Sequence, residues 1–389
     1  MQQKWSRRLT FLAFVVLMVG LGSNDSLRGI FSTIFQEHFA LSTTQVGLIV
    51  TASYIGNLVF LLVGGNLSTR FSKKRVLQVL ILIWMLALAL FAFTDNYVVL
   101  LAGMALALGS STLLNTTMNL ITPLLFAATP GFFVNFLFFT QEIGTSGSQY
   151  ILGSHADGFV FWQRTNLVLL LLGAAAFALL FFCKVPEEPA AAQEESHPQG
   201  GYNWRIVVPY VLVFGFYFIA EHGVMNWMVA YGVDGLGLPQ ASAATYLSIF
   251  FGGMMIGRLC LSPLVDKLGV LKSLKVFGGV SCVLYLIGSL GGTVTMPIWA
   301  VSGLSFSILY PTLVMSIRLY FPARQISGAA GTILSIASLA DILFNVGFGR
   351  LVDVAGYAFS VRLLPLSTAA FFVVFLLFTR FCKPTQALK

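Results

Sequence analysis

The sequence contains little charge. Of its 389 residues, only 9% are Asp, Glu, Lys or Arg, whereas 57% are hydrophobic, and the mean hydropathy is +0.88. Soluble domains carry about 25% charged residues. The shortage of charge therefore excludes an ordinary soluble domain and indicates that lipid surrounds most of the chain. The net charge of +8 does not indicate nucleic-acid binding, because the basic residues fall in short segments between apolar runs.

Cysteine, histidine and the motifs of catalysis are also scarce. The four cysteines, Cys183, Cys260, Cys282 and Cys382, form no CxxC pair and have no histidine near them, which argues against a disulfide framework and a zinc site. The chain contains no P-loop, HExxH or GxSxG motif. We therefore expect no enzyme activity, no cofactor and no metal.

What the sequence has instead is long apolar runs. A bilayer core about 30 Å thick needs about 20 apolar residues per helix, and twelve runs of this kind are bounded by charges or by turn-forming residues. We predict spans over residues 9–35, 45–66, 76–94, 98–122, 130–153, 165–183, 206–231, 241–263, 270–290, 294–317, 325–349 and 357–381. The expected fold class is an all-α membrane protein with twelve transmembrane helices.

The distribution of Lys and Arg predicts the orientation of these spans. With the N-terminus in the cytoplasm, the inner segments hold 17 basic residues and the outer ones hold only Arg164, Arg350 and Arg362. Arg28 and Arg258 fall within spans. Because cytoplasmic loops carry the excess of Lys and Arg, we expect both termini on the cytoplasmic side, in a bacterial inner membrane.

One polar segment divides the chain into two similar halves. Residues 184–205 include a stretch rich in Pro and Glu without apolar periodicity, which predicts a cytoplasmic linker between bundles at 1–183 and 206–389. At an offset of 197 positions, Asn24-Asp25 align with Glu221-His222. A parallel repeat of six spans is the architecture of the major facilitator transporters.

The loops after the second span of each half resemble the loop motif of the major facilitator superfamily. The first is GNLSTRFSKKR from Gly65, which contains Arg70, and the second is SPLVDKLGVLK from Ser262, which contains Asp266 and Lys267. The resemblance implies that Arg70, Asp266 and Lys267 belong to a gating loop. The first copy has Thr69 where the motif has Asp, which weakens the charge latch in that half.

Within the superfamily, two segments resemble the fucose–glucose–galactose proton symporter group. They run from Ser23 to Gly56 and from Phe218 to Gly232, and the likeness extends over nearly the whole chain. The resemblance places Asp25 at the position of a first-helix carboxylate. It also places Asn115 where the fourth helix of the group commonly carries an acid, so proton coupling here would need another group, another ion, or would be absent.

Four carboxylates fall within predicted spans: Asp25, Glu142, Glu221 and Asp341. An acid at the centre of a membrane helix costs at least about 2.5–3.5 kcal/mol, so each should face a partner or a wet cavity. Arg28 lies one turn after Asp25 and could neutralise it, whereas a protonatable Asp25 could couple transport to a proton. We expect Asp25 first for that role, and Glu142 or Glu221 second.

Further polar side chains share helix faces with these acids. Gln141 precedes Glu142 in a polar stripe, Asn115 and Asn119 are four residues apart, and so are Asp341 and Asn345. These groups either contact solute or bond helices together. On the seventh span we place Glu221 and Asn226 ahead of His222, because a lone histidine is more often a packing residue. Trp227 either stacks on a sugar ring or anchors the span at the interface.

These observations predict a secondary transporter of a small polar organic solute, which we expect to be a sugar because amide and hydroxyl groups suit a polyhydroxylated molecule. We expect the solute between the two halves, near Asp25, Asn115, Asn119, Gln141, Glu142, Glu221, Asn226, Trp227, Asp341 and Asn345. The expected partners are this solute, a proton or another ion, and lipid, with no nucleic acid, and we expect a monomer. The alternatives are an exporter of lipophilic compounds, with some of the 36 Phe lining its cavity, and a non-transporting membrane sensor.

Overall fold

The computed structural model describes residues 2–126, 130–183, 185–186, 202–322 and 325–384. Within these residues every regular element is a helix and none is a strand. A helix satisfies its own backbone hydrogen bonds, which is the requirement for crossing lipid without a closed barrel. The chain forms two compact units, Met1–Ala192 and Gln193–Lys389. Most of the predicted linker, namely residue 184 and residues 187–201, lies outside the described residues.

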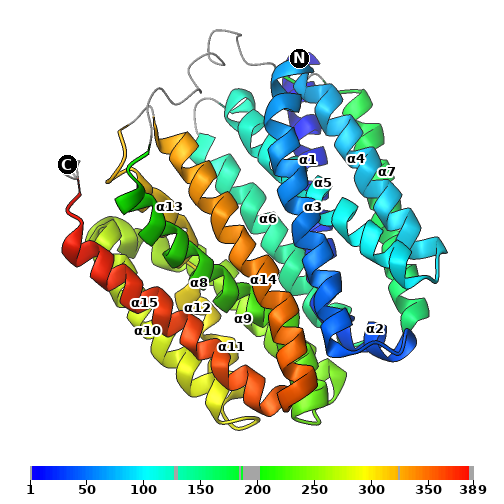
Figure 1. Cartoon of the computed structure of the whole chain (residues 1–389). Helices are drawn as coiled ribbons and strands as arrows, with labels where there is room; N and C mark the ends of the chain where they lie inside the picture. The colour runs from blue at the N-terminus through cyan, green and yellow to red at the C-terminus, as the bar shows by residue number, and fades with distance from the viewer. Residues whose placement is uncertain (1, 127–129, 184, 187–201, 323–324, 385–389) are drawn as a thin grey trace. The chain divides into compact units, whose positions relative to one another are not determined.

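The N-terminal unit is built of long helices joined by short turns (Figure 1). They are α1 Gln2–Ile30, α2 Ser32–His38, α3 Thr43–Arg70, α4 Lys73–Phe93, α5 Tyr97–Leu125, α6 Pro130–Ile151 and α7 Phe159–Phe181. Helix α3 packs along α5, α4 packs along α5 and α7, and α1 packs along α6 and α7. α7 begins six residues before the predicted span, so Arg164 lies inside this helix rather than in an outer loop.

Side chains outside the apolar runs determine where some of these helices begin. The Asn96 side chain accepts hydrogen bonds from the backbone N–H groups of Val98 and Val99 at 2.9 and 3.2 Å, which caps α5. Ser72 caps α4 by accepting from the N–H of Arg75 at 3.4 Å. Because the first N–H groups of a helix have no partner within it, polar caps favour these starting points.

Glycine brings α1 and α6 into backbone contact. A Cβ atom on Gly22 would lie 2.0 Å from the carbonyl oxygen of Gln141, and one on Gly144 would lie 2.1 Å from that of Val19. The hydroxyl of Thr145 also donates to the carbonyl of Gly22 at 3.2 Å. Small residues allow such close approach between membrane helices, so the packing of α1 against α6 requires glycine at both positions.

The C-terminal unit repeats this order of packing. Its elements are α8 Trp204–Ala230, the π-turn η3 Tyr231–Gly235, α9 Gln240–Leu268, α10 Val270–Leu290, α11 Met296–Val301, α12 Gly303–Phe306, α13 Leu309–Ile317, α14 Ile326–Ser360, the 3-10 turn η5 Val361–Leu363 and α15 Leu364–Phe381. Helix α8 packs along α14 and α15, α9 packs on α12, and α10 packs on α15. These pairs correspond to α1 with α6 and α7, α3 with α5, and α4 with α7.

The predicted span over 294–317 is not one continuous helix. It consists of α11, α12 and α13, with breaks after Val301 and Phe306. The hydroxyls of Ser302, Ser305 and Ser307 donate to backbone carbonyls three residues earlier, at 2.6, 2.8 and 2.7 Å. Such bonds compete with the regular helical ladder, which accounts for the interruptions.

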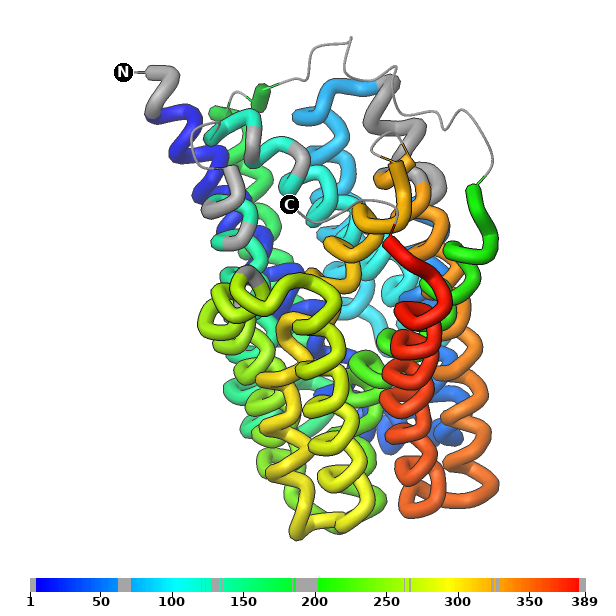
Figure 2. The backbone as a smooth tube through the Cα atoms, turned by 90° about the vertical axis from the view of Figure 1, so that its left-hand side faces the viewer, coloured from blue at the N-terminus to red at the C-terminus, as the bar shows by residue number. Residues whose placement is uncertain are grey.

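Each of the twelve predicted spans falls on helical segments of the described chain. Ten stretches are long and apolar enough to cross a membrane, and the last of them, Ala329–Phe381, covers 53 residues. This stretch includes most of α14 and all of α15. Gly356, near the end of α14, leaves the helical conformation at φ 76° and ψ 165°, and the chain then reverses direction (Figure 2). Arg350, predicted in an outer loop, lies within α14.

Candidate functional site

In the N-terminal unit, Asp25 lies partly buried on α1 and faces α5. The hydroxyl of Ser111, on α5, donates to its two carboxylate oxygens at 3.3 and 3.4 Å. One turn further along α1, Arg28 is buried, and its guanidinium lies 5.2 Å from the centre of the Tyr54 ring on α3. A permanent cation therefore sits one turn from this acid, in contact with an aromatic face.

A second group of polar side chains connects α5 to α6. The amide of Asn115 donates to the side-chain oxygen of Gln141 at 2.7 Å, and the amide of Asn119 donates to that of Asn115 at 2.6 Å. All three residues are only partly buried. Glu142 occupies the next position on α6 and is partly buried as well. These amides retain further donors and acceptors that could bind a hydroxylated solute.

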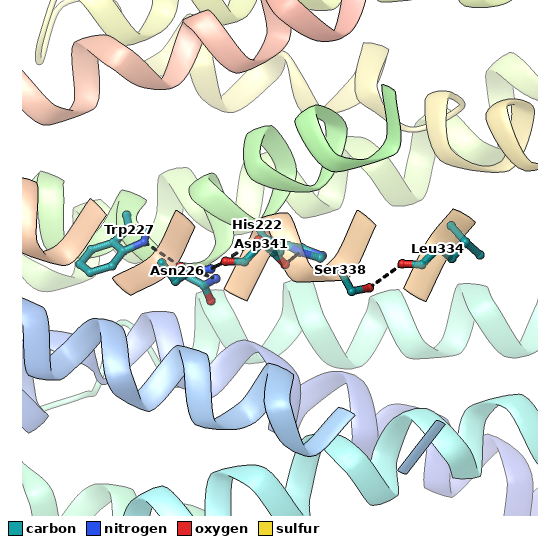
Figure 3. Close-up of polar contacts among 7 residues, drawn as sticks. His222, Asn226, Trp227, Leu334, Ser338 and Asp341 are labelled. Atoms are coloured by element: carbon teal, nitrogen blue, oxygen red, sulfur yellow. Dashed lines mark hydrogen bonds and ion pairs between the residues drawn. The ribbon is translucent and has the colours of Figure 1, made fainter. Parts of the chain in front are cut away.

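In the C-terminal unit, an acid and a histidine meet across two helices. His222 on α8 and Asp341 on α14 form a hydrogen bond between the imidazole Nδ1 and a carboxylate oxygen (Figure 3). The side chain of Asp341 is only 2% exposed, whereas that of His222 is 23% exposed. The imidazole is thus the more accessible member of the pair.

Asn345 extends this contact one turn along α14. Its amide donates to the backbone carbonyl of Asp341 at 2.8 Å, and its side-chain oxygen accepts from the indole N–H of Trp227 at 3.0 Å and from the amide of Asn226 at 3.4 Å. Asn345 and Trp227 have no exposed surface, and Asn226 has almost none. Figure 3 shows the residues along the facing sides of α8 and α14.

Trp227 is fully buried, and its ring packs against Phe348 at 5.1 Å between ring centres. Its role at the solute site stays a prediction. Its indole fixes the orientation of the Asn345 amide, because an indole can only donate a hydrogen bond.

Glu221 belongs to a different group, although it is the neighbour of His222 in sequence. Tyr217 on α8 and Tyr310 on α13 each interact electrostatically with both Glu221 and Arg258, the latter on α9. Adjacent helix positions point about 100° apart, which explains why Glu221 and His222 have different surroundings. Glu221 therefore does not join the network of Asp341.

The predicted gating loops lie at the ends of two long helices. Arg70 is the last residue of α3, and Asp266 and Lys267 are in the last turn of α9. The side chain of Lys267 is exposed, whereas those of Arg70 and Asp266 are outside what the structure describes. The gating role of these three residues stays a prediction.

Some residues of these groups were missed or placed low on the sequence alone. Ser111, Tyr217 and Tyr310 are ordinary residues in an apolar helix and give no sequence signal. At the 197-residue offset His222 aligns with Asp25 and Asp341 aligns with Gly144, which identifies equivalent positions in the two halves but does not show that His222 and Asp341 pair. The described residues contain no group of three or more His, Cys, Asp or Glu that could hold a metal ion.

Apolar helices that carry carboxylates and amides at membrane depth, in two similarly packed units, define a multi-pass membrane transporter. The chain belongs to the Major Facilitator Superfamily, whose family profile matches residues 10–340. This confirms the resemblance noted in the loops and the expectation that the chain is not an enzyme.

Individual relatives and structures are consistent with this family. The chain is 26% identical over 397 residues to a glucose/galactose transporter of Brucella abortus biovar 1 (strain 9-941), with 95% of this chain and 94% of the relative covered. The structure of a D-xylose-proton symporter shares the fold with a TM-score of 0.78 at 16% identity, over 98% of each chain. A fucose:proton symporter of E. coli gives a TM-score of 0.64 at 19% identity, over 94% of this chain and 98% of that one.

Proposed function

We propose that this chain is a proton-coupled secondary active transporter that moves a small polar organic solute, a sugar, by alternating access. The observation that carries the proposal is the Gln141–Asn115–Asn119 group, in which amides from two helices bond to one another and remain only partly buried. Groups that both donate and accept suit a neutral molecule with several hydroxyls better than they suit a lipophilic cation.

The likeness to a glucose/galactose transporter over nearly the full length of both chains supports the same class of solute here. We place the protein in a bacterial inner membrane with both termini in the cytoplasm, on the strength of the Lys and Arg distribution. Asp25, with the hydroxyl of Ser111 beside it, is the acceptor for solute hydroxyls in the N-terminal unit. Carboxylates are strong acceptors for such groups.

A thermal-shift screen tests the class of solute. Purified protein is heated with glucose, galactose, a set of amino acids or tetraphenylphosphonium, since a ligand that binds only the native state raises the apparent melting temperature. We expect stabilisation by the hexoses. A response confined to the lipophilic cation would refute the sugar proposal in favour of an exporter.

The Gln141→Leu variant links the solute to the amide group. We expect the KM for hexose uptake in proteoliposomes to rise about tenfold, which corresponds to roughly one hydrogen bond to the solute. Gln163→Leu is the matched control, because Gln163 lies near the start of α7 and donates to the carbonyl of Thr94 at 3.4 Å. Equal KM values for the two variants would remove Gln141 from the solute site.

A further inference from the structure

Among the ionisable pairs that the structure describes, the pair with the most deeply buried acid lies in the C-terminal unit. Asp341 is 2% exposed and bonds to the imidazole of His222, which is 23% exposed. A buried carboxylate without a partner would be costly in this setting. The imidazole removes that cost, and it is also a group that gains and loses protons near neutral pH.

Asp25, the first choice from the sequence, has different neighbours. The hydroxyl of Ser111 donates to its carboxylate, and a hydroxyl does not exchange a proton at physiological pH. Arg28, one turn away, keeps its charge at all relevant pH values. Asp25 is thus bonded to a hydroxyl, whereas Asp341 is bonded to an imidazole, a group that can carry a proton.

From this geometry we infer that His222 and Asp341 carry the coupling proton of the transporter. This inference rests on the proposed proton-coupled transport. A proton from water binds the Nε2 atom of His222, and the proton on Nδ1 passes to the carboxylate oxygen of Asp341. The imidazole returns to its neutral form with the other tautomer, and the pair as a whole gains one proton and loses one negative charge. Release runs through the same atoms in reverse.

The hydrogen bonds around the pair hold it in place for this transfer. Asn345 bonds to Asp341 and is itself held by Trp227 and Asn226 on α8. The other side of the imidazole is stacked on Phe218 at 5.5 Å, with the planes 6° apart. The ring is therefore oriented by contacts on both helices. Asn345 acts as a positioning residue, because its amide also donates to the carboxylate oxygen Oδ1 of Asp341 at 3.4 Å, and Trp227 holds that amide in place.

Other ionisable groups on the surrounding elements act on the charge of this pair. On the pair's own helices and those packed against them, the described titratable side chains are Arg205, Tyr210, Tyr217 and Glu221 on α8, Tyr231 and Asp234 on η3, Tyr246, Arg258, Cys260 and Lys267 on α9, Tyr310 on α13, Arg350, Asp353 and Tyr357 on α14, Arg362 on η5 and Arg380 on α15. Glu221 and Arg258 carry opposite charges and act on the same two tyrosines, so their long-range effects on the pair partly cancel. Arg350 and Asp353 lie more than two turns beyond Asp341.

Coupled and uncoupled transport separate the roles of the pair. In proteoliposomes with a proton gradient of about one pH unit, wild-type protein is expected to accumulate hexose up to about tenfold for one proton per solute. The Asp341→Asn variant should accumulate none beyond equilibrium, yet it should still exchange hexose in counterflow, which needs no proton gradient. Accumulation by this variant at the wild-type ratio would overturn the inference.

The His222→Gln variant provides a second measurement if Asp341→Asn does not fold. Glutamine can still donate a hydrogen bond to Asp341, but it cannot relay a proton. We expect it to lose accumulation while counterflow persists, and Asp341→Glu to restore part of the loss seen with Asp341→Asn. The control is His38→Gln, which removes a surface histidine that bonds to Asp95 at 2.7 Å in the N-terminal unit. Unchanged accumulation in His222→Gln would contradict the relay.

Infrared difference spectra recorded between about pH 5 and pH 8 test the pair without any solute. Wild-type protein should show the carbonyl band of a carboxyl group that protonates on acidification, and Asp341→Asn should lack this band. If the band is the same in both proteins, the inference is wrong. If the band behaves as expected but no hexose binds or moves, the sugar proposal fails and the proton-carrying pair stands.

Discussion

The helix pair α1 and α6 and the helix pair α8 and α14 occupy the same place in the two repeats, yet they are held together by different chemistry. In the N-terminal unit Gly22 and Gly144 let the backbones touch. In the C-terminal unit the position aligned with Gly144 is Asp341, which bonds to His222. The two repeats therefore share the packing of this helix pair but differ in the residues that form the contact.

This difference determines which unit has ionisable groups in the contact between these two helices. A glycine contact holds no proton and offers no alternative bonding, so it fixes the distance between α1 and α6. A contact made of an imidazole and a carboxylate has more than one protonation state, and each state has its own hydrogen bonds. On the inference above, the C-terminal unit is the one whose contact between α8 and α14 carries the proton.

The largest expected effect comes from closing the space that glycine leaves. In the Gly144→Ala variant the new Cβ would meet the Val19 carbonyl oxygen at 2.1 Å, and we expect a loss of about 2–3 kcal/mol of stability from overpacking. Thermal or denaturant unfolding in detergent measures it. The control is Gly147→Ala, where nothing lies within 4 Å and better helix propensity should leave stability equal or slightly higher. Equal losses in both would show that the close contact is not what matters.

A smaller effect should follow from breaking the polar contact in the other unit. Asn345→Leu leaves the indole of Trp227 without its acceptor in a fully buried position, and we expect about 1–3 kcal/mol of destabilisation. Ser338→Ala serves as the comparison, because the hydroxyl of Ser338 donates to the carbonyl of Leu334 on its own helix at 2.8 Å. If Asn345→Leu is as stable as Ser338→Ala, the network does not hold α8 to α14.

The Asp25→Asn variant sharpens the contrast between the two acids. We expect a rise in the KM for hexose of about tenfold, from a weakened hydrogen bond to solute, with the accumulation ratio at saturating hexose unchanged. Uptake and counterflow in proteoliposomes measure both quantities. Loss of accumulation with counterflow preserved would instead assign the proton to Asp25, the role that the sequence suggested first.

The smallest effect is expected for a second His–Asp pair, which lies at the protein surface. His38 and Asp95 are 33% and 59% exposed, and exposed ion pairs contribute between about 0 and 1 kcal/mol. Asp95→Asn should therefore change the unfolding free energy by less than about 0.5 kcal/mol and leave transport unaltered. A loss of transport in this variant would show that burial is not what distinguishes the His222–Asp341 pair.

Much of the fold could be predicted because its signals are local. Each span is a run of apolar residues, and the repeat is visible as an offset of 197 positions. The interruptions between α11, α12 and α13 could not be predicted from apolar content. They depend on serine hydroxyls that bond to the backbone, and on the close approach of Gly303 to the Phe250 carbonyl on α9, 2.0 Å from an added Cβ.

The sequence could predict candidate residues for the site but not which of them contact one another. Polar residues inside apolar helices identified Asp25, Gln141, Asp341 and Asn345 as candidates. The partner of Asp341 lies 119 residues away, and helix periodicity says nothing about which residue of another helix will face it. The ranking of His222 below Glu221 and Asn226 therefore could not take account of its bond to Asp341.

Trp227 gives the C-terminal unit an optical probe of its own. Its indole is sealed from solvent and donates to the side chain of Asn345, whose amide also donates to the carboxylate of Asp341 at 3.4 Å, so movement of that carboxylate would alter the surroundings of the fluorophore. Acidification should then shift the emission of the native chain, with no dye attached. Comparison with Trp227→Phe would isolate the signal and allow the kinetics of protonation to be followed in real time.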